Sequence, residues 1–302
     1  MNKRIKIWLI TAAALVAAGV IVFAAAMTAH GWDFNKLSTV KYQSNTYELN
    51  EVFGSITIDT DTADITLIKT DEEKCKVVCN ESEKVKYSAS VDNGKLIIKE
   101  TDERKWYEYI GINVKSPVIT VYLPNTEYDR LTIKNGTGDV KISEDFKLET
   151  VNISTSTGDI SLKNAEAESI ELSVSTGKIT LTDVNCKGNV KLKSSTGKTK
   201  ITSLKCENLT SQGNTGDISL NNVIATEIMS VSRSTGDVKL EKCDAAEISI
   251  NTNTGDVKGT VLTEKVFETK SSTGDIHVPK TANGGKCEIT TSTGDIEIDI
   301  AH

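Results

Sequence analysis

The strongest constraint on the fold of this chain is a Thr-Gly pair that recurs at a nearly constant interval. Nine such pairs occur within residues 136–302, and successive glycines are always 19 or 20 residues apart. The nine glycines are Gly138, Gly158, Gly177, Gly197, Gly216, Gly236, Gly255, Gly274 and Gly294. A fixed period near 20 residues is typical of repeat architectures, in which each unit stacks on the next.

Apolar and polar residues alternate on both sides of each glycine. Ile160 and Leu162 follow Gly158 at positions two and four, and Val151 and Ile153 precede it at positions seven and five. Alternation with period two predicts two short strands per repeat, each with one buried face. Stacked repeats bury this face by pairing each strand in parallel with its copy. We therefore predict an all-β fold, a parallel β-solenoid with two main strands per coil of about 19.5 residues. Eight intervals of about 4.8 Å give a rod about 38 Å long.

A third apolar position lies seven residues after most of the glycines, where it predicts an inward-pointing corner between strands. Its occupants are Ala165, Val184, Leu204, Val223, Cys243 and Leu262. Ile276 and Val278, two and four residues after Gly274, are predicted to face the core in the same way as Ile160 and Leu162.

The Thr-Gly-Asp triplet itself predicts a corner of the coil. Glycine adopts a positive φ that residues with a Cβ resist. Threonine and aspartate side chains can bond to the turning backbone. We therefore interpret the nine glycines as structural turns, and Thr62–Ile65 as a degenerate copy of the same corner.

The N-terminal segment determines the expected location of the protein. Basic residues precede an apolar run from Ile7 to Ala29, which is long enough to cross a bilayer. Trp8 and Trp32 flank the run as interfacial aromatics do. The basic N-terminus predicts a cytoplasmic tail at residues 1–6 and a single-pass anchor at 7–29, with the ectodomain outside the cytoplasm at the cell membrane.

The alternative is a cleaved signal peptide with Ala24 and Ala26 at its cleavage site. After the apolar run we expect a linker at 30–45, an irregular β start and N-terminal cap at 46–135, and the regular repeats at 136–302. The chain stops directly after the last corner. An uncovered final coil is an open sheet edge, which could pair with another copy of the chain or with a partner. Self-association through the C-terminal coil is therefore one expectation, and the alternative is that Glu297 and Asp299 keep the chain monomeric.

At this point the sequence resembles the exported β-strand-repeat proteins of Gram-positive bacteria named "putative adhesins" (domain of unknown function 4097). The resemblance covers nearly the whole chain and rests on the Ser-Thr-Gly-Asp-Ile corners at 156–160 and 292–296, and on residues 31–34, 103–107 and 284–290. It implies a β-solenoid and an envelope location. Some relatives are associated with envelope-stress systems.

The aspartates that follow the corner glycines are the first candidate ligands. In a stack they form a column with a spacing of about 4.8 Å, in which Ca²⁺ could bind to Asp217, Asp237, Asp256, Asp275 and Asp295. Each corner offers one carboxylate, and Lys178 and Lys198 interrupt the column. We therefore predict no metal and no cofactor, with the aspartates capping backbone groups.

The six cysteines occupy positions expected to be buried, as small hydrophobic residues do. Cys186 and Cys206 both lie nine residues after their glycines. Neighbouring coils would place their Cα atoms about 5 Å apart, within the range of a disulfide. A Cys186–Cys206 disulfide is therefore the alternative to two free thiols.

Catalytic signals are absent from the sequence. The three histidines are His30, His277 and His302, and no nucleophile elbow, P-loop or zinc-protease motif is present. We predict that the protein is not an enzyme. The net charge of −7 and the absence of a basic patch with aromatics argue against nucleic-acid binding.

Residues 101–110 contain Trp106, Tyr107 and Tyr109 among charged residues. Such aromatics suit contacts with sugars or proteins. The alternative interpretation is that they cover the open end of the core.

Taken together, these patterns favour a non-catalytic binding or scaffolding protein of the cell surface, bound to a cell-wall polymer or envelope protein. The second hypothesis is an envelope-stress or signalling accessory that contacts a membrane partner. A third, disfavoured hypothesis is an enzyme acting on envelope glycans.

Overall fold

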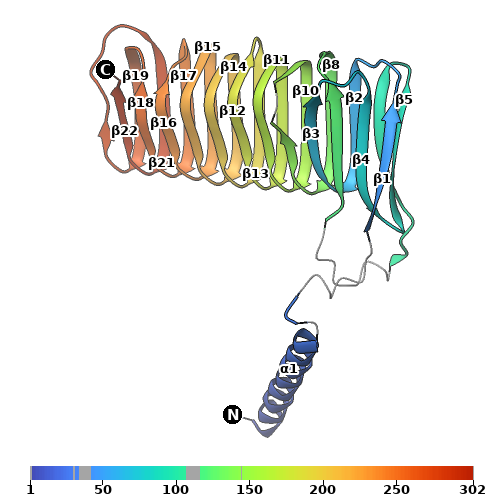
Figure 1. The fold of residues 1–302 in the computed structure, drawn as a ribbon. Coiled ribbons are helices and arrows are strands. Elements are labelled where there is room, and N and C mark those ends of the chain that lie inside the picture. The colour runs from blue at the N-terminus through green and yellow to red at the C-terminus, as the bar shows by residue number, and fades with distance from the viewer. Residues whose placement is uncertain (1, 30, 34–41, 107–115, 144, 302) are drawn as a thin grey trace.

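The computed structural model describes residues 2–29, 31–33, 42–106, 116–143 and 145–301. Within these residues the chain forms one N-terminal helix followed by a long β-solenoid (Figure 1). The most apolar 18-residue stretch of helix α1 (Lys3–Ala29) has a mean hydropathy of 2.5 and is unburied, so the length and composition of the helix suit a membrane span. The Tyr107 and Tyr109 predictions, and His30 and His302, lie outside the described residues.

The solenoid is built from the following strands: β1 (Tyr42–Leu49), β2 (Ser55–Thr62), β3 (Asp64–Thr70), β4 (Cys75–Ser82), β5 (Val85–Asp92), β6 (Lys95–Asp102), β7 (Val118–Pro124), β8 (Glu127–Thr137), β9 (Val140–Ile142), β10 (Phe146–Thr157), β11 (Ile160–Thr176), β12 (Ile179–Cys186), β13 (Asn189–Thr196), β14 (Thr199–Thr215), β15 (Ile218–Thr235), β16 (Val238–Cys243), β17 (Glu247–Thr254), β18 (Val257–Val261), β19 (Lys265–Thr273), β20 (Ile276–His277), β21 (Gly285–Thr293) and β22 (Ile296–Ile300).

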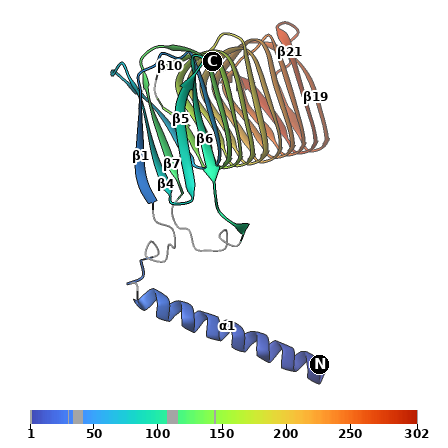
Figure 2. The ribbon, with the colours of Figure 1, turned by 90° about the vertical axis from the view of Figure 1, so that its right-hand side faces the viewer.

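Each coil has two faces joined by two corners (Figures 1 and 2). We call the strands that lead into the Thr-Gly-Asp turn the pre-corner face and those that follow it the post-corner face. Strands β11, β14 and β15 run through the second corner and contribute to both faces. Neighbouring coils pair in parallel and in register, for example Ile160 with Ile179 and Ile170 with Val190. The predicted parallel β-solenoid is confirmed.

The N-terminal end of the solenoid is closed by antiparallel strands. β1 pairs with β4, β4 pairs with β7, and β5 pairs with β6. The hairpin of β5 and β6 has Asn93 and Gly94 at its turn, with φ values of 49° and 72°. Two positive φ values suit a two-residue hairpin turn. β1 begins at Tyr42, inside the segment expected to be a linker.

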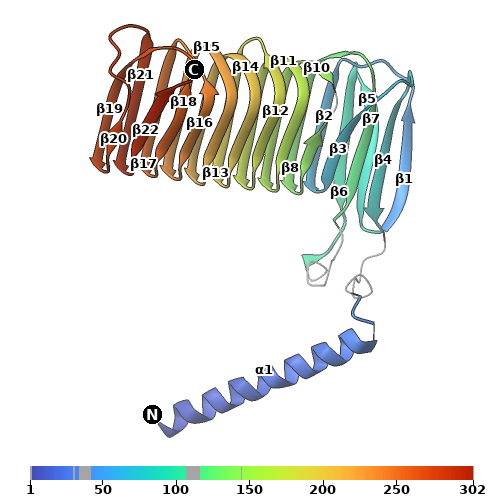
Figure 3. The same ribbon diagram turned by 60° about the vertical axis from the view of Figure 1, so that its left-hand side comes forward.

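The coils at both ends of the stack are out of sequence order. β2 lies between β6 and β8, and β3 lies between β7 and β9. At the other end, β21 lies between β17 and β19, and β22 lies between β18 and β20 (Figure 3). The last coil of the chain is therefore inserted into the stack, and the coil before it is outermost.

This order bears on the predicted self-association through the C-terminal coil, which stays a prediction. β22 pairs with β18 over Ile296–Ile300, but with β20 only at Ile296 and Glu297, so the described structure gives the outer edge of residues 298–300 no strand partner. The outermost strands are β19 and β20. β20 has two residues, and Pro279, which follows closely, has no amide hydrogen to donate to a neighbouring strand. Ile276 is 40% exposed because β20 has a neighbour on one side only, unlike the buried position predicted for it.

The prediction for Leu262 at the inward corner is wrong. Leu262 is 39% exposed, and Val261 is 1% exposed in its place. In five earlier coils the residue six after the glycine has a φ between 49° and 56°, which turns the next residue inward. These residues are Asn164, Asp183, Ser203, Asn222 and Lys242. In the coil after Gly255 this turn is missing and Val261 pairs directly with Cys243.

The glycine corners bring the backbones of successive coils very close together. All nine glycines have φ between 125° and 148°. A Cβ on Gly216 would lie 2.2 Å from the carbonyl oxygen of Gly197 in the previous coil. The amide of Gly216 donates to Thr235 O of the next coil at 2.9 Å. Ala63 holds the equivalent place in the coil of β2 and β3, where its amide donates to Thr137 O at 3.0 Å.

All six cysteines are buried free thiols, so Cys186 and Cys206 are not joined in this structure. Instead Cys186 Sγ donates to Glu168 O at 3.5 Å. Burial raises the pKa of the Cys206 thiol to about 12, and Cys75, Cys79 and Cys287 are raised to about 12 by the same cause.

A pair of glycine substitutions tests the corner. Gly216→Ala should lower the melting temperature much more than Gly94→Ala, because only the first adds a backbone clash between coils. Gly94 also has a positive φ, but nothing lies within 4 Å of its added Cβ. The left-handed conformation alone costs about 1–2 kcal/mol. Thermal unfolding followed by circular dichroism measures both, and equal losses would contradict a close approach at the corner.

Thiol labelling tests the burial of the cysteines. At pH 8 the folded chain should resist iodoacetamide, and the unfolded, unreduced chain should take up six labels. Uptake of four would instead indicate a Cys186–Cys206 disulfide.

The buried thiols also make the stability of the fold depend on pH. The ordinary thiol pKa is 9.0, and the pKa of Cys206 in the folded chain is about 12. Between pH 9 and pH 12 this thiol is therefore protonated in the folded chain and ionised in the unfolded chain, so unfolding releases a proton. Stability should therefore fall as the pH rises from about 9 towards 12.

Candidate functional site

The aspartates after the corner glycines form a hydrogen-bonded column along one edge of the rod. Asp159 N donates to Asp139 Oδ1 at 2.8 Å, and Lys178 N donates to Asp159 Oδ1 at 2.7 Å. Asp256 N donates in the same way to Asp237 Oδ1 at 2.9 Å. Each carboxylate thus caps the amide at the same position of the next coil.

The column follows the spatial order of the coils and not their order in sequence. Asp295 N donates to Asp256 Oδ1 at 2.9 Å, and Asp275 N donates to Asp295 Oδ1 at 3.0 Å. At the N-terminal end, Asp64 accepts from Asp139 N at 2.9 Å. The degenerate corner therefore makes the same contact as the regular ones.

Lysines and backbone amides already contact several carboxylates of the column. Lys198 Nζ lies 3.0 Å from Asp217 Oδ2, and Lys258 Nζ lies 2.9 Å from Asp256 Oδ2. The Lys198 ammonium and the Asp237 amide lower the pKa of Asp217. Within the residues that the structure describes, no group of three His, Cys, Asp or Glu side chains could hold a metal ion. One oxygen of most of these carboxylates is already used by the neighbouring coil, which leaves few oxygen ligands for Ca²⁺.

The surface grooves are lined by a mixture of acidic, basic and polar side chains. One groove of about 300 Å³ lies where β8, β10 and β11 approach the second corner. In it Lys147 lies 3.4 Å from Glu127, and Lys187 lies 2.6 Å from Glu168. Its lining contains no histidine or cysteine. Such a groove offers ion pairs and no recognisable nucleophile with its base.

Arg233 is a buried cation that the sequence pattern did not identify as special. Its side chain is 3% exposed, and Nη2 donates to Thr199 Oγ1 at 3.1 Å and to Ser211 Oγ at 3.0 Å. A Cβ on Gly213 would lie 2.6 Å from Nη1. Burial lowers the Arg233 pKa to about 10. Thr199 and Ser211 stand where other coils have Val, Ile or Leu, and this departure was the available signal.

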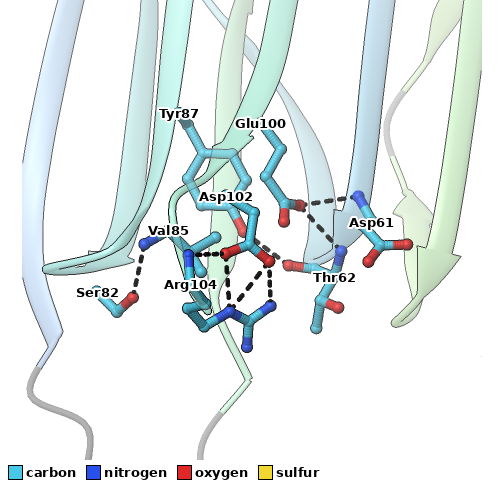
Figure 4. A network of polar contacts seen from close by, with 8 residues as sticks. All are labelled: Asp61, Thr62, Ser82, Val85, Tyr87, Glu100, Asp102 and Arg104. Carbon is cyan, nitrogen blue, oxygen red and sulfur yellow. Dashed lines mark hydrogen bonds and ion pairs between the residues drawn. The ribbon is translucent and has the colours of Figure 1, made fainter. Parts of the chain in front are cut away.

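The N-terminal cap carries a second polar network at the edge of the glycine corners (Figure 4). Glu100 Oε2 accepts from the amides of Asp61 at 2.8 Å and Thr62 at 3.0 Å. Tyr87 donates its hydroxyl to Thr62 O at 2.6 Å. Burial is the main cause that raises the pKa of Glu100. The sequence pattern gave no signal for this network, because its members come from strands outside the regular repeat.

The predicted aromatic patch follows this network in sequence, and Trp106 is its member that the structure describes. Trp106 is 78% exposed, so within the described residues it does not cover the open end of the core. Arg104 precedes it and contacts both carboxylate oxygens of Asp102, with its Nη2 at 2.6 Å from Oδ2. The exposed tryptophan is thus carried on a stem held by an ion pair.

The sequence profile of the Toastrack DUF4097 family matches residues 53–241 and 203–302. Among solved structures, a "putative lipid binding protein" from Parabacteroides distasonis has a TM-score of 0.55 at 14% identity, over 85% of this chain and 97% of that one. A "putative adhesin" from Bacteroides fragilis has a TM-score of 0.49 at 17% identity, over 87% and 99%. At 14% identity the first likeness shows a shared fold. No curated protein matches the chain.

The profile match runs continuously from residue 53 to residue 302 and so covers far more than half of the chain. The corners, the column and the stacked faces described above all lie within it. The chain belongs to the Toastrack DUF4097 family.

Proposed function

We propose that this protein is a non-catalytic binding or scaffolding protein of the cell envelope. The supporting observation is a stacked solenoid that offers long polar faces and surface grooves lined by charged and polar side chains. Its binding partner would be a cell-wall polymer or an envelope protein that touches many coils at once. Many weak contacts along a rigid stack add up to useful avidity.

The uncharged middle of the pre-corner face is the surface we assign to this binding. Here the outward residues Ser230 and Ser232 of β15 pair with Ser249 and Asn251 of β17. On the other side they pair with Thr210 and Gln212 of β14. Hydroxyl and amide groups in such rows can donate and accept hydrogen bonds from a polar polymer.

Helix α1 is proposed to hold the solenoid at the membrane, outside the cytoplasm. Its most apolar 18 residues are unburied, and Lys3, Arg4 and Lys6 lie at its N-terminal end. Basic residues at one end of a span favour the cytoplasmic side. A cleaved signal peptide is the alternative, and the mass of the mature protein would distinguish the two.

The second candidate function is an envelope-stress or signalling accessory that contacts a membrane partner. The observation that favours it is the exposed Trp106 on the N-terminal cap, the part of the solenoid joined to α1 in sequence. Cross-linking of the full chain in native membranes would capture such a partner.

Co-sedimentation of the full chain in detergent with isolated cell walls tests the main proposal. We expect saturable binding that is unchanged by a calcium chelator, because the aspartate column bonds to backbone amides. Ser232→Lys with Asn251→Lys should weaken binding several-fold by placing charges on the uncharged rows. Ser161→Lys with Thr180→Lys, a neighbouring pair on the post-corner face, is the control. Absence of binding, or equal loss from both pairs, would contradict the assignment.

A further inference from the structure

The outermost coil of the stack presents a long strand edge. β19 pairs with β21 from Lys265 to Thr273, and within the described residues no other strand pairs with it (Figure 3). Thr281, which lies between β20 and β21, contacts β19 at its first residue, where its hydroxyl donates to Lys265 O. The rest of this nine-residue strand has one edge without a described strand partner.

The apolar core is also incompletely covered at this end of the stack. The inward residues Phe267 and Thr269 of β19 lie opposite Cys287 and Ile289 of β21. Cys287 and Ile289 are buried, whereas Phe267 and Thr269 are only half-buried. Apolar surface gathered at one place is typical of an interaction site. Three large hydrophobic residues are exposed here, by 39%, 37% and 40%: Leu262, Val266 and Ile276.

The backbone direction of β19 identifies the groups at its open edge. Thr273 O accepts from Gly294 N of the neighbouring coil at 2.9 Å. Backbone groups of successive residues in a strand point to opposite edges, so those of Thr269 point towards β21 as those of Thr273 do. The N–H and C=O groups of Glu268 and Lys270 therefore point to the open edge. Unpaired groups in such a row are a template for another strand.

The charges on the outward row of β19 indicate which strand fits this edge. The Glu268 side chain is 61% exposed, its carboxylate lies 3.1 Å from Lys286 Nζ, and Lys270 is exposed two residues further on. In an antiparallel pair of two β19 strands centred on Thr269, each Glu268 lies opposite Lys270 of the other copy. A register shift of two residues in either direction places Glu268 or Lys270 opposite its own copy, where like charges repel. The edge is therefore complementary to itself in one register.

This register also suits the backbone and the core. The edge-pointing groups of Glu268 and Lys270 meet as hydrogen-bonded pairs, and Thr269 faces its own copy as a non-hydrogen-bonded pair. Opposite residues of an antiparallel pair share a face of the sheet, so the inward rows of both copies join on one side. The N-terminal cap lies at the other end of each rod (Figure 1).

We infer that two copies of this chain pair edge to edge through β19, antiparallel and centred on Thr269. Such a contact is isologous, because the same surface of both copies forms it, and it closes as a two-fold dimer. The product is a rod of twice the length with an N-terminal cap at each end. The inference is independent of the proposed binding to the cell wall, because the rows assigned to that binding lie on other strands.

Charge exchange on β19 tests the inference in the full chain. Sedimentation in detergent over a range of protein concentrations should show a dimer. Glu268→Lys and Lys270→Glu should each weaken the dimer several-fold, because each places like charges opposite one another twice. The double variant E268K/K270E restores opposite charges and should recover most of the affinity. A monomer at every concentration, or a dimer that ignores both single changes, would overturn the inference. Helix α1 is the same in all variants, so association through α1 would not follow this pattern.

A cysteine at the two-fold centre tests the register. In a non-hydrogen-bonded pair the two Cα atoms are about 4.5 Å apart, so Thr269→Cys should form a covalent dimer on mild oxidation. Ser272→Cys is the matched control, because its own copy would lie about 20 Å away along the strand. The six native cysteines are buried free thiols, and circular dichroism checks that each variant is folded. Equal cross-linking of both variants, or a folded Thr269→Cys chain without a cross-link, would overturn this register.

Discussion

The close approach of successive backbones at the glycine corner is the constraint on which the rest of the solenoid depends. A Cβ on any of the nine corner glycines would lie 1.8 to 2.3 Å from a carbonyl oxygen of a neighbouring coil. This contact requires glycine, and it keeps the coils close enough for each carboxylate in the column to reach the next amide. The corner therefore determines both the repeat in the sequence and the hydrogen bonds that hold consecutive coils in register. Residues elsewhere in the coil vary more freely, provided that the inward rows stay apolar.

The order of the coils at both ends of the stack hinders the loss of a terminal coil. A solenoid with sequential coils can lose its terminal coil by breaking one set of strand pairs, because each repeat contacts only its neighbours. Here β21 and β22 are paired on both sides, so release of the chain terminus would break contacts with two coils. The coil of β2 and β3 is held in the same way at the other end. The outermost strands at the C-terminal end of the stack are the nine-residue β19 and the two-residue β20, while antiparallel strands close the N-terminal end.

Much of this fold could be predicted because the period is carried by residues with one physical role each. The coils, the two faces, the degenerate corner at Ala63 and the capping role of the aspartates follow from spacing and residue type. The order of the end coils does not, since Gly274 and Gly294 sit in nearly identical corners and either coil could stack on its predecessor. The prediction for Leu262 was wrong because the inward position depends on a left-handed residue just before it. In the other coils this residue is Asn, Asp, Ser or Lys, so it has no single sequence signature. The burial of Arg233 depends on three positions of the neighbouring strand β14, Thr199, Ser211 and Gly213, which only the stacking of the coils brings together around it.

The contrast between the regular corners and the irregular parts of the chain also concerns function. At the corners, the chemically active side chains are already bonded to backbone amides, so the most conspicuous feature of the sequence serves the architecture. Recognition must then come from the outward rows of the faces or from the parts where the repeat ends. The cap differs from the coils in this respect: several of its strand pairs are antiparallel, its polar network joins Tyr87 and Glu100 to the corner at Thr62, and the large apolar side chains of Val52 and Trp106 are exposed on it. A rod tethered at that end would have one end fixed by the cap and its polar faces left available to partners along its length.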